Sequence, residues 1–396
     1  MSNNDVIALL EELVAIPSVN PEHTSDETIA NEGRMADFLS TFLETRGCSV
    51  ARDVLSPERS SVIGAYGPDT PRYTLLLEAH TDTVGVGGMV IPPFTPRITQ
   101  GRLYGRGACD TKGPMAACLT ALQPERLDRL AEAGVKVLFI GAFGEEKGNL
   151  GAERLVEQGM GADAALILEP TELALVHAHK GALWYELILL GEAAHGSDPA
   201  KGKNAILAMA DTLTWLREQL EKDVQAHQHP HLGVPTLNIG RIVGGEAMNI
   251  VAQRCAIEVD RRLVPGEDPE AIMNNLHAYL SACKDAGRIR GYEVNTIKLG
   301  LPFETQTNSA MVADLKRALE ANGQAPSLAT AAWYSDAGAF ARTCPEVVVF
   351  GPGSIKQAHR EDEYIELTAL QTGQRVIASY LDQVAARIGA AGAGDA

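Results

Sequence analysis

The stretch YTLLLEAH (73–80) is a short apolar run that ends in polar residues, and it decides the fold that we expect. Three further runs have the same form: VKVLFIGAFGEE (135–146), ADAALILEP (162–170) and PEVVVFGPG (345–353). Segments of helical character lie between them, one beginning near Gly113 and another near Gly151. Continuous apolar strands that alternate with helices predict an α/β domain with a mainly parallel sheet and helices on both faces. Residues 3–16 and 26–46 predict two helices before the first strand.

The pattern changes between residues 180 and 296. Two runs of alternating polarity, ALWYELILLG (182–191) and CAIEVDRRLV (255–264), accompany helical segments near 203–222 and 268–286 and a strand that ends near 299. This order predicts a smaller α+β unit of the βαββαβ type, inserted into the larger domain. We therefore expect a discontinuous larger domain of residues 1–179 and 297–396, and an inserted domain of residues 180–296.

Composition excludes several classes of function. The chain has 396 residues, of which 34 are Lys or Arg and 51 are Asp or Glu, so the formal net charge is −17. Such an acidic chain is a poor candidate for binding nucleic acid or an anionic membrane surface. The N-terminal stretch has no signal-peptide pattern, and no apolar run approaches the length of a membrane span. Six scattered cysteines without CxxC spacing favour a reducing compartment, so we expect a cytoplasmic protein.

Polar residues follow each apolar run at the point where the strand should end. In open parallel sheets ligands bind beyond these carboxyl ends. A histidine or an acid at such a position is, taken singly, more often an ordinary loop residue. Because these histidines and acids all follow the ends of predicted strands, together they favour a metal site. Mixed nitrogen and oxygen donors suit zinc. The candidates are His80, Asp82, Asp110 in the glycine-rich stretch GRLYGRGACDTKG (101–113), the pair Glu145-Glu146, Glu169 and His359.

The same motifs resemble a known family. HTDT (80–83), GRGACDTKG (105–113), GEEKGNLGA (144–152), LEPT (168–171) and QAHREDEY (357–364) are similar to the di-zinc metallopeptidases. That family includes acetylornithine deacetylase, succinyl-diaminopimelate desuccinylase, aminoacylase and bacterial glutamate carboxypeptidase. The resemblance runs from about residue 5 to residue 385. The acetylornithine deacetylase branch is the most similar, through AHKG (178–181), PTLNIGRIVGGEAMN (235–249) and GPGSIKQAHREDEYIE (351–366).

The resemblance implies a centre with two Zn²⁺ ions, for which Co²⁺ or Mn²⁺ can substitute. Asp110 would bridge both ions, with His80 and Glu169 completing one site and Glu146 and His359 completing the other. A cis peptide bond after Asp110 is also implied.

Roles for the remaining site residues follow from the resemblance as well. Glu145 would be the general base, and Asp82 would orient a histidine ligand by accepting its second ring N–H. The inserted domain would serve as lid and dimerisation domain of a homodimer, and His195 would reach the active site of the partner subunit. A surface histidine on a lid strand is the alternative for His195. The implied substrate contacts are Asn249, Arg261 and Gly351. Either Asn249 or Arg261 could equally be a salt-bridge residue of the lid.

The sequence departs from the acetylornithine deacetylase pattern at two places. Where that enzyme has Thr-Glu-Ala, this chain has Ser335-Asp336-Ala337, a form nearer to the desuccinylase and carboxypeptidase branches. We interpret the shorter acid as a change that could alter recognition of a basic side chain. The tripeptide Lys147-Gly148-Asn149 after the glutamate pair differs as well.

These observations predict an enzyme that hydrolyses the amide bond of an N-acyl-L-amino acid by means of a zinc-activated water. The favoured substrate is N²-acetyl-L-ornithine, which would place the enzyme in arginine biosynthesis. Desuccinylase, general aminoacylase and dipeptidase activities are the alternatives within the family. A non-catalytic dimeric binding protein on the same scaffold is the alternative from another class.

Overall fold

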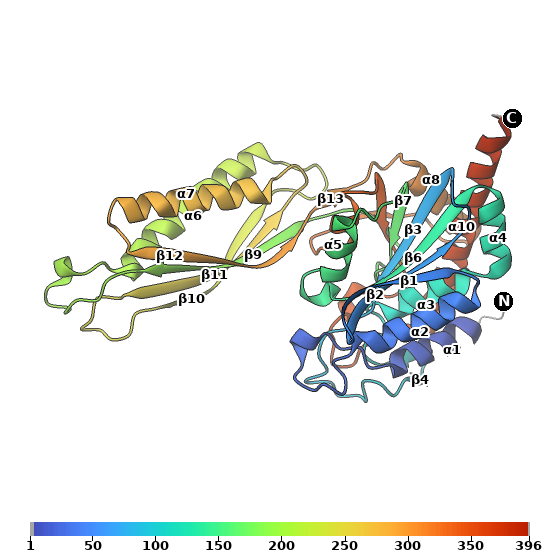
Figure 1. Cartoon of the computed structure of the whole chain (residues 1–396), viewed down its shortest axis with the longest axis horizontal. Helices are drawn as coiled ribbons and strands as arrows, with labels where there is room; N and C mark the ends of the chain where they lie inside the picture. Colours follow the sequence, from blue (N-terminus) through green and yellow to red (C-terminus); the bar gives the residue numbers. More distant parts are fainter. Residues whose placement is uncertain (1–3, 395–396) are drawn as a thin grey trace. The chain divides into compact units, whose positions relative to one another are not determined.

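The computed structural model describes residues 4–394, which form two compact units (Figure 1). The larger unit comprises the described parts of Met1–Ala178, Glu304–Thr330 and Ser335–Ala396. The inserted unit comprises His179–Phe303 and Ala331–Tyr334.

The larger unit is built on a nine-stranded sheet whose centre is parallel. Its strands run in the order β1-β2-β6-β3-β7-β15-β8-β13, and β14 pairs with β8. The pairs β6–β3, β3–β7 and β7–β15 are parallel, whereas β1, β2 and β8 join antiparallel. The strands are β1 (Ser49–Ser56), β2 (Arg59–Tyr66), β3 (Tyr73–His80), β6 (Val135–Ala142), β7 (Ala164–Ile167), β8 (Leu175–His179), β13 (Phe303–Glu304), β14 (Leu328–Ala331) and β15 (Glu346–Val349).

Both faces of the parallel strands are buried. Along β3, Leu75 and Leu77 belong to the main hydrophobic core, whereas Leu76 is equally buried on the opposite side, as the alternation of a strand requires. This explains the continuous apolar runs in the sequence. The predicted α/β class is confirmed. The four parallel strands coincide with the four apolar runs.

Helices cover this sheet. The long α10 packs against α3, α8 and α4, α1 packs against α3, and the short α9 packs against β7 and β15 with α5 beside it. These helices are α1 (Asn4–Ala15), α2 (Glu32–Thr45), α3 (Lys112–Ala121), α4 (Pro124–Glu132), α5 (Leu150–Glu157), α8 (Ala310–Ala321), α9 (Ala337–Phe340) and α10 (Leu367–Gly394). Single 3₁₀ turns occur at η1 (Pro21–His23), η2 (Glu145–Lys147) and η4 (Ile355–Gln357), and a small sheet joins β16 (Tyr364–Glu366), β5 (Arg102–Tyr104) and β4 (Arg97–Thr99).

The helix predicted over residues 26–46 begins later than the sequence pattern suggests. The carboxylate of Asp26 accepts the backbone N–H of Thr28 at 2.9 Å, which closes a turn and competes with helix formation. The helix α2 starts only at Glu32, where the side chain of Asn31 caps it by accepting the N–H of Arg34 at 3.2 Å.

The inserted unit is a four-stranded antiparallel sheet with two helices over one face (Figure 1). The sheet order is β10-β11-β9-β12, and the chain order has the predicted βαββαβ form. Its elements are β9 (Gly181–Leu190), η3 (Pro199–Lys201), α6 (Ala205–Ala226), β10 (Thr236–Gly244), β11 (Arg254–Leu263), α7 (Pro269–Asp285) and β12 (Gly291–Gly300). The edge strand β10 is largely exposed, and only Leu237 and Ile239 pack against the hydrophobic core of this unit. Within residues 4–394, no helix is long and apolar enough to span a membrane.

Candidate metal centre

Parallel pairing brings three strand ends to one edge of the sheet. His80, the last residue of β3, lies opposite Ala142, the last residue of β6. Glu78 of β3 lies opposite Ile167, the last residue of β7. The segments that leave these strands carry Glu145-Glu146 and Glu169, so all four side chains emerge at the same edge.

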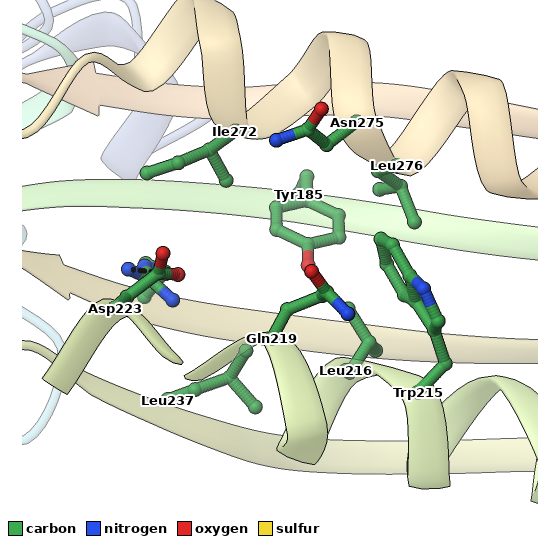
Figure 2. A pocket seen from close by; sticks show the side chains of 10 residues that line it. Tyr185, Trp215, Leu216, Gln219, Asp223, Leu237, Ile272, Asn275 and Leu276 are labelled. Carbon is green, nitrogen blue, oxygen red and sulfur yellow. Dashed lines mark ion pairs between the residues drawn. The ribbon is translucent and has the colours of Figure 1, made fainter. Parts of the chain in front are cut away.

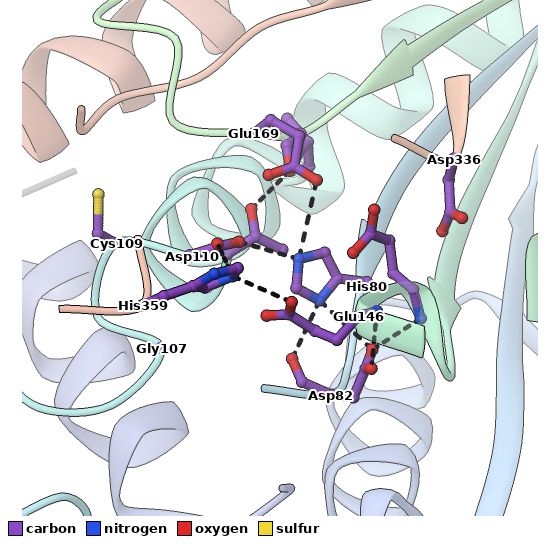
Figure 3. A network of polar contacts seen from close by, with 12 residues as sticks. His80, Asp82, Gly107, Cys109, Asp110, Glu146, Glu169, Asp336 and His359 are labelled. Carbon is purple, nitrogen blue, oxygen red and sulfur yellow. Dashed lines mark hydrogen bonds and ion pairs between the residues drawn. The ribbon is translucent and has the colours of Figure 1, made fainter. Parts of the chain in front are cut away.

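Two groups of side chains meet there and share one residue (Figure 3). His80 Nε2 lies 3.1 Å from Asp110 Oδ1 and 3.7 Å from Glu169 Oε1. His359 Nε2 lies 3.4 Å from the other oxygen of Asp110 and 3.1 Å from Glu146 Oε2. Asp110 thus faces both groups, one with each carboxylate oxygen.

The donor set of both groups fits a divalent cation. In each group one imidazole nitrogen and two carboxylate oxygens lie within 4.8 Å of one another, and this combination of ligand types suits zinc. One oxygen of Glu146 is buried without a hydrogen-bond partner among the described residues. A buried acceptor without a partner is costly, and a cation would satisfy it.

The loop that carries Asp110 is held by a carboxylate that the sequence analysis did not identify. Glu363 is buried, and it accepts the backbone N–H groups of Gly107, Cys109 and Asp110 at 2.9–3.0 Å. It also accepts a hydrogen bond from Arg106 at 2.7 Å. The Asp110–Thr111 peptide bond in this loop is cis, which confirms the expectation. Glu363 stands only four residues after His359, so it links the two ligand-bearing segments.

Asp82 holds the turn that carries Glu145 and Glu146. Its carboxylate accepts the backbone N–H groups of Glu145 and Glu146, both at 3.1 Å, and the side-chain amide of Asn20 at 2.8 Å. His80 Nδ1 lies 3.0 Å from the backbone oxygen of Asp82 and 3.4 Å from its carboxylate. The arrangement fits the predicted orienting role, although the backbone oxygen is the nearer acceptor. Asn20 lies too far away in the sequence to be found from the motif.

Glu145 is half-buried in the turn η2, directly after Gly144. Gly144 has φ 78°, a left-handed conformation that glycine adopts without strain. Behind this turn, the buried Glu32 forms an ion pair with Arg59 at 2.7 Å, and Arg59 Nη2 would lie 2.8 Å from a Cβ at position 144. Sequence reasoning missed this ion pair, because neither residue belongs to a strand-end motif.

Burial and mutual charge shift the pKa values of the ligand groups strongly. Burial, together with the charge of Asp110, raises the pKa of Glu146 to about 8 and that of Glu169 well above 4.5. Hydrogen bonds to Asp110 and Glu146 raise the pKa of His359 to about 10. Burial lowers the pKa of His80, but its contacts with Asp110 and Asp82 outweigh this and raise it well above 6.5. The cluster therefore retains protons at neutral pH when no cation is bound.

In the inserted unit, the structure brings together two of the predicted residues. The N–H of Gly196 donates to the carbonyl of Asn249 at 2.7 Å, and His195 forms an isolated β-bridge with Ile250. His195 is exposed, and its Nδ1 lies 2.7 Å from the hydroxyl of Ser197. His195 and Asn249 thus lie on neighbouring loops of the inserted unit.

Arg261 is buried and lines a cavity of about 40 Å³ between the inserted sheet and its helices. Tyr185 and Trp215 line the same cavity (Figure 2). The guanidinium of Arg261 forms ion pairs with Glu267 and, at 3.0 Å, with Asp223. A substrate carboxylate would have to displace these partners, so the geometry favours the alternative of an internal ion pair.

Gly351 lies in the larger unit, where its backbone N–H donates to Thr171 Oγ1 at 3.1 Å. A Cβ at this position would come within 2.7 Å of the carbonyl oxygen of Glu169. The glycine is therefore required for close packing against the segment that carries Glu169. Its predicted contact with substrate stays a prediction.

Metal binding should release protons, because histidine and carboxylate ligands bind cations in their deprotonated forms. Hydrogen bonds raise the pKa of His359 to about 10 and burial raises the pKa of Glu146 to about 8, so this hydrogen-bonded pair holds a proton at pH 7. We expect Zn²⁺ affinity to weaken as the pH falls from 8 to 6. Titration calorimetry in buffers of different ionisation enthalpy measures the protons released. His359→Ala should release fewer, and a pH-independent affinity would contradict the expectation.

The chain is similar to a known protein family over most of its length. Residues 76–383 match the model of peptidase family M20/M25/M40. The chain is 30% identical to an acetylornithine deacetylase from Proteus mirabilis, over 95% of this chain and 96% of the other. It is also 30% identical to one from Edwardsiella ictaluri, over 91% and 92%.

Solved structures show the same fold. An M20 family metallo-carboxypeptidase from Sulfolobus solfataricus superposes with a TM-score of 0.77 at 20% identity, covering 96% of this chain and 99% of the other. A dinuclear metal-binding peptidase from Bacillus subtilis superposes with a TM-score of 0.67 at 15% identity, covering 96% and 97%. With two ligand groups joined at Asp110 and a family match over most of its length, the chain belongs to the M20/M25/M40 family of metallo-hydrolases.

Proposed function

We propose that this chain hydrolyses the amide bond of an N-acyl-L-amino acid and that its substrate is N²-acetyl-L-ornithine, in arginine biosynthesis. The observation that carries the proposal is the pair of ligand groups sharing Asp110. Identity of 30% to acetylornithine deacetylases over nearly the whole chain supports the choice of substrate. The six cysteines are free, which agrees with a cytoplasmic enzyme.

Two zinc ions are the proposed cofactors. His80, Asp110 and Glu169 would hold one, and Asp110, Glu146 and His359 would hold the other. When bound, the pair supplies Lewis-acid chemistry, in which it polarises the scissile carbonyl and lowers the pKa of a water molecule.

The side chains of the protein then carry the proton transfers. Glu145 would take a proton from the attacking water and deliver it to the leaving amine, which is general acid–base catalysis by one carboxylate. Two observations support this role. The N–H of Glu145 donates to Asp82, which fixes the turn, and Glu145 is near enough to contribute to the raised pKa of Glu169. Asp82 would orient His80 for ligation.

The proposal includes a homodimer formed through the inserted unit, in which His195 stabilises the developing oxyanion in the partner's active site and Asn249 contacts the substrate. The exposed edge strand β10 supports the dimer. Ile242 and Val243 of this strand are 54% and 47% exposed, and Met248 in the following loop is fully exposed. An exposed apolar edge of this kind invites pairing with another chain. The loop that carries Met248 also carries Asn249, beside His195.

The substrate assignment is tested by comparing acyl release from N-acetyl-L-ornithine, N-acetyl-L-citrulline, N-acetyl-L-methionine and N-succinyl-L,L-diaminopimelate with the zinc-loaded protein. We expect the highest kcat/KM for acetylornithine. Turnover of the succinyl compound alone would overturn this choice in favour of the desuccinylase. A zinc-loaded protein that hydrolyses none of the four would instead support the binding-protein alternative.

Glu145→Gln should abolish most turnover while leaving the metal content unchanged, because the amide keeps the shape of the side chain but cannot accept a proton. We expect kcat to fall by about 10²–10⁴-fold, the usual contribution of a general base. Metal analysis should still find two equivalents. His80→Ala is the contrasting variant, for which metal content itself should fall. A rate near that of the wild type in Glu145→Gln would refute the base assignment.

Ile242→Lys should convert the dimer into a monomer, because it places a charge on the exposed edge of β10. Sedimentation velocity measures the change, and turnover should fall with dimer content if His195 acts across the interface. Ile297→Lys is a matched control, since Ile297 is 51% exposed on β12, the other edge strand of the same sheet. If Ile297→Lys dissociates the dimer and Ile242→Lys does not, the proposed interface is wrong.

A further inference from the structure

The two places where the sequence departs from the acetylornithine deacetylase pattern contact each other. Asn149 Nδ2 donates a hydrogen bond to Asp336 Oδ1 at 2.7 Å, although 187 positions separate the two residues. Both side chains are buried, with exposed fractions of 2% and 1%. The carboxylate of Asp336 is therefore engaged inside the larger unit, which argues against the interpretation that this acid recognises a basic substrate side chain.

Asn149 closes the turn that carries the proposed base. The backbone N–H groups of Gly148 and Asn149 donate to the carbonyl of Glu145 at 3.2 and 3.3 Å. Asn149 has φ 57°, a left-handed conformation that is uncommon outside glycine and that asparagine tolerates best. It stands at the N-cap of α5, yet its side chain makes no capping hydrogen bond. The amide is instead directed to Asp336.

Asp336 offers this amide a fixed partner. It directly precedes the helix α9, all of whose residues are buried and which packs against β7 and β15. The carboxyl of Glu78, on the neighbouring strand β3, interacts with Asp336 as well. The acceptor Asp336 is thus anchored to the central sheet, whereas the donor Asn149 belongs to the turn that follows β6.

We propose that Asp336 and Asn149 are positioning residues for the reaction: their hydrogen bond fixes the turn Glu145–Asn149 and thereby the carboxylate of Glu145. This inference rests on the proposed function of Glu145 as the base. Neither side chain contacts the reacting atoms in this scheme. Their effect passes through the backbone bonds from residues 148 and 149 to the carbonyl of Glu145.

The test compares four variants of the full-length, zinc-loaded protein. Asn149→Gly accommodates the left-handed backbone and removes only the amide, and Asp336→Ala removes the acceptor. Asp336→Asn is the conservative control, because its side-chain oxygen can still accept from Asn149. The double variant Asn149→Gly/Asp336→Ala shows whether the two residues act as a pair.

We expect kcat for N-acetyl-L-ornithine to fall about tenfold or more in Asn149→Gly and in Asp336→Ala, with KM changed by less than about twofold and two equivalents of metal retained. The double variant should be no slower than either single variant, and Asp336→Asn should stay near the wild-type rate. Wild-type kcat in Asn149→Gly, or additive losses in the double variant, would overturn the proposal.

Hydrogen–deuterium exchange gives a readout that does not depend on turnover. Amides of residues 144–150 should exchange faster in Asn149→Gly and Asp336→Ala than in the wild type, and Asp336→Asn should not change them. Unchanged exchange in Asn149→Gly would overturn the proposal whatever the rates. If the wild type hydrolyses no N-acyl amino acid, the proposed function fails, while faster exchange in Asn149→Gly would still support the positioning of the turn.

Discussion

The parallel pairing of β3 with β6 and β7 is the constraint on which the rest of the site depends. Its register sets His80 opposite Ala142 and Glu78 opposite Ile167, so the chain leaves all three strands at one edge. A slip of one residue would turn His80 to the opposite face of the sheet, because successive side chains of a strand alternate. The buried apolar residues on both faces resist such a slip, so the hydrophobic core also determines the geometry of the centre.

A buried cluster of acids is unfavourable unless other groups hold it in place. Here two carboxylates outside the ligand groups do so. Asp82 accepts backbone N–H groups from Glu145 and Glu146, and Glu363 accepts them from the loop that contains Asp110. These bonds fix the backbone of the ligand residues rather than their side chains. The side-chain oxygens of Asp110 and Glu146 therefore remain directed at the centre, where a cation would balance their charge.

Much of this site could be predicted from the sequence because its signal is local. A continuous apolar run followed by His or Glu indicates both the strand and the position of its last residue, and the predicted strand 73–80 coincides with β3. Asn20 and Glu363 could not be found in this way, since their contacts join segments distant in the chain. The start of α2 depends on a side-chain turn at Asp26, and β10 is exposed along most of its length, with only Leu237 and Ile239 packed against the core, so neither gave a clear periodic pattern.

Arg261 and Asp336 illustrate a more general difficulty. Both were connected with substrate recognition because their charge suits a substrate group, and both are buried beside partners within their own unit. A sequence motif cannot tell whether a charge serves a ligand or an internal contact. At position 336 the length of the side chain matters, since a glutamate would add a buried methylene beside Asn149, to which Asp336 is hydrogen-bonded. The two departures from the deacetylase pattern therefore meet in one buried hydrogen bond inside the larger unit, which gives the shorter acid an internal partner.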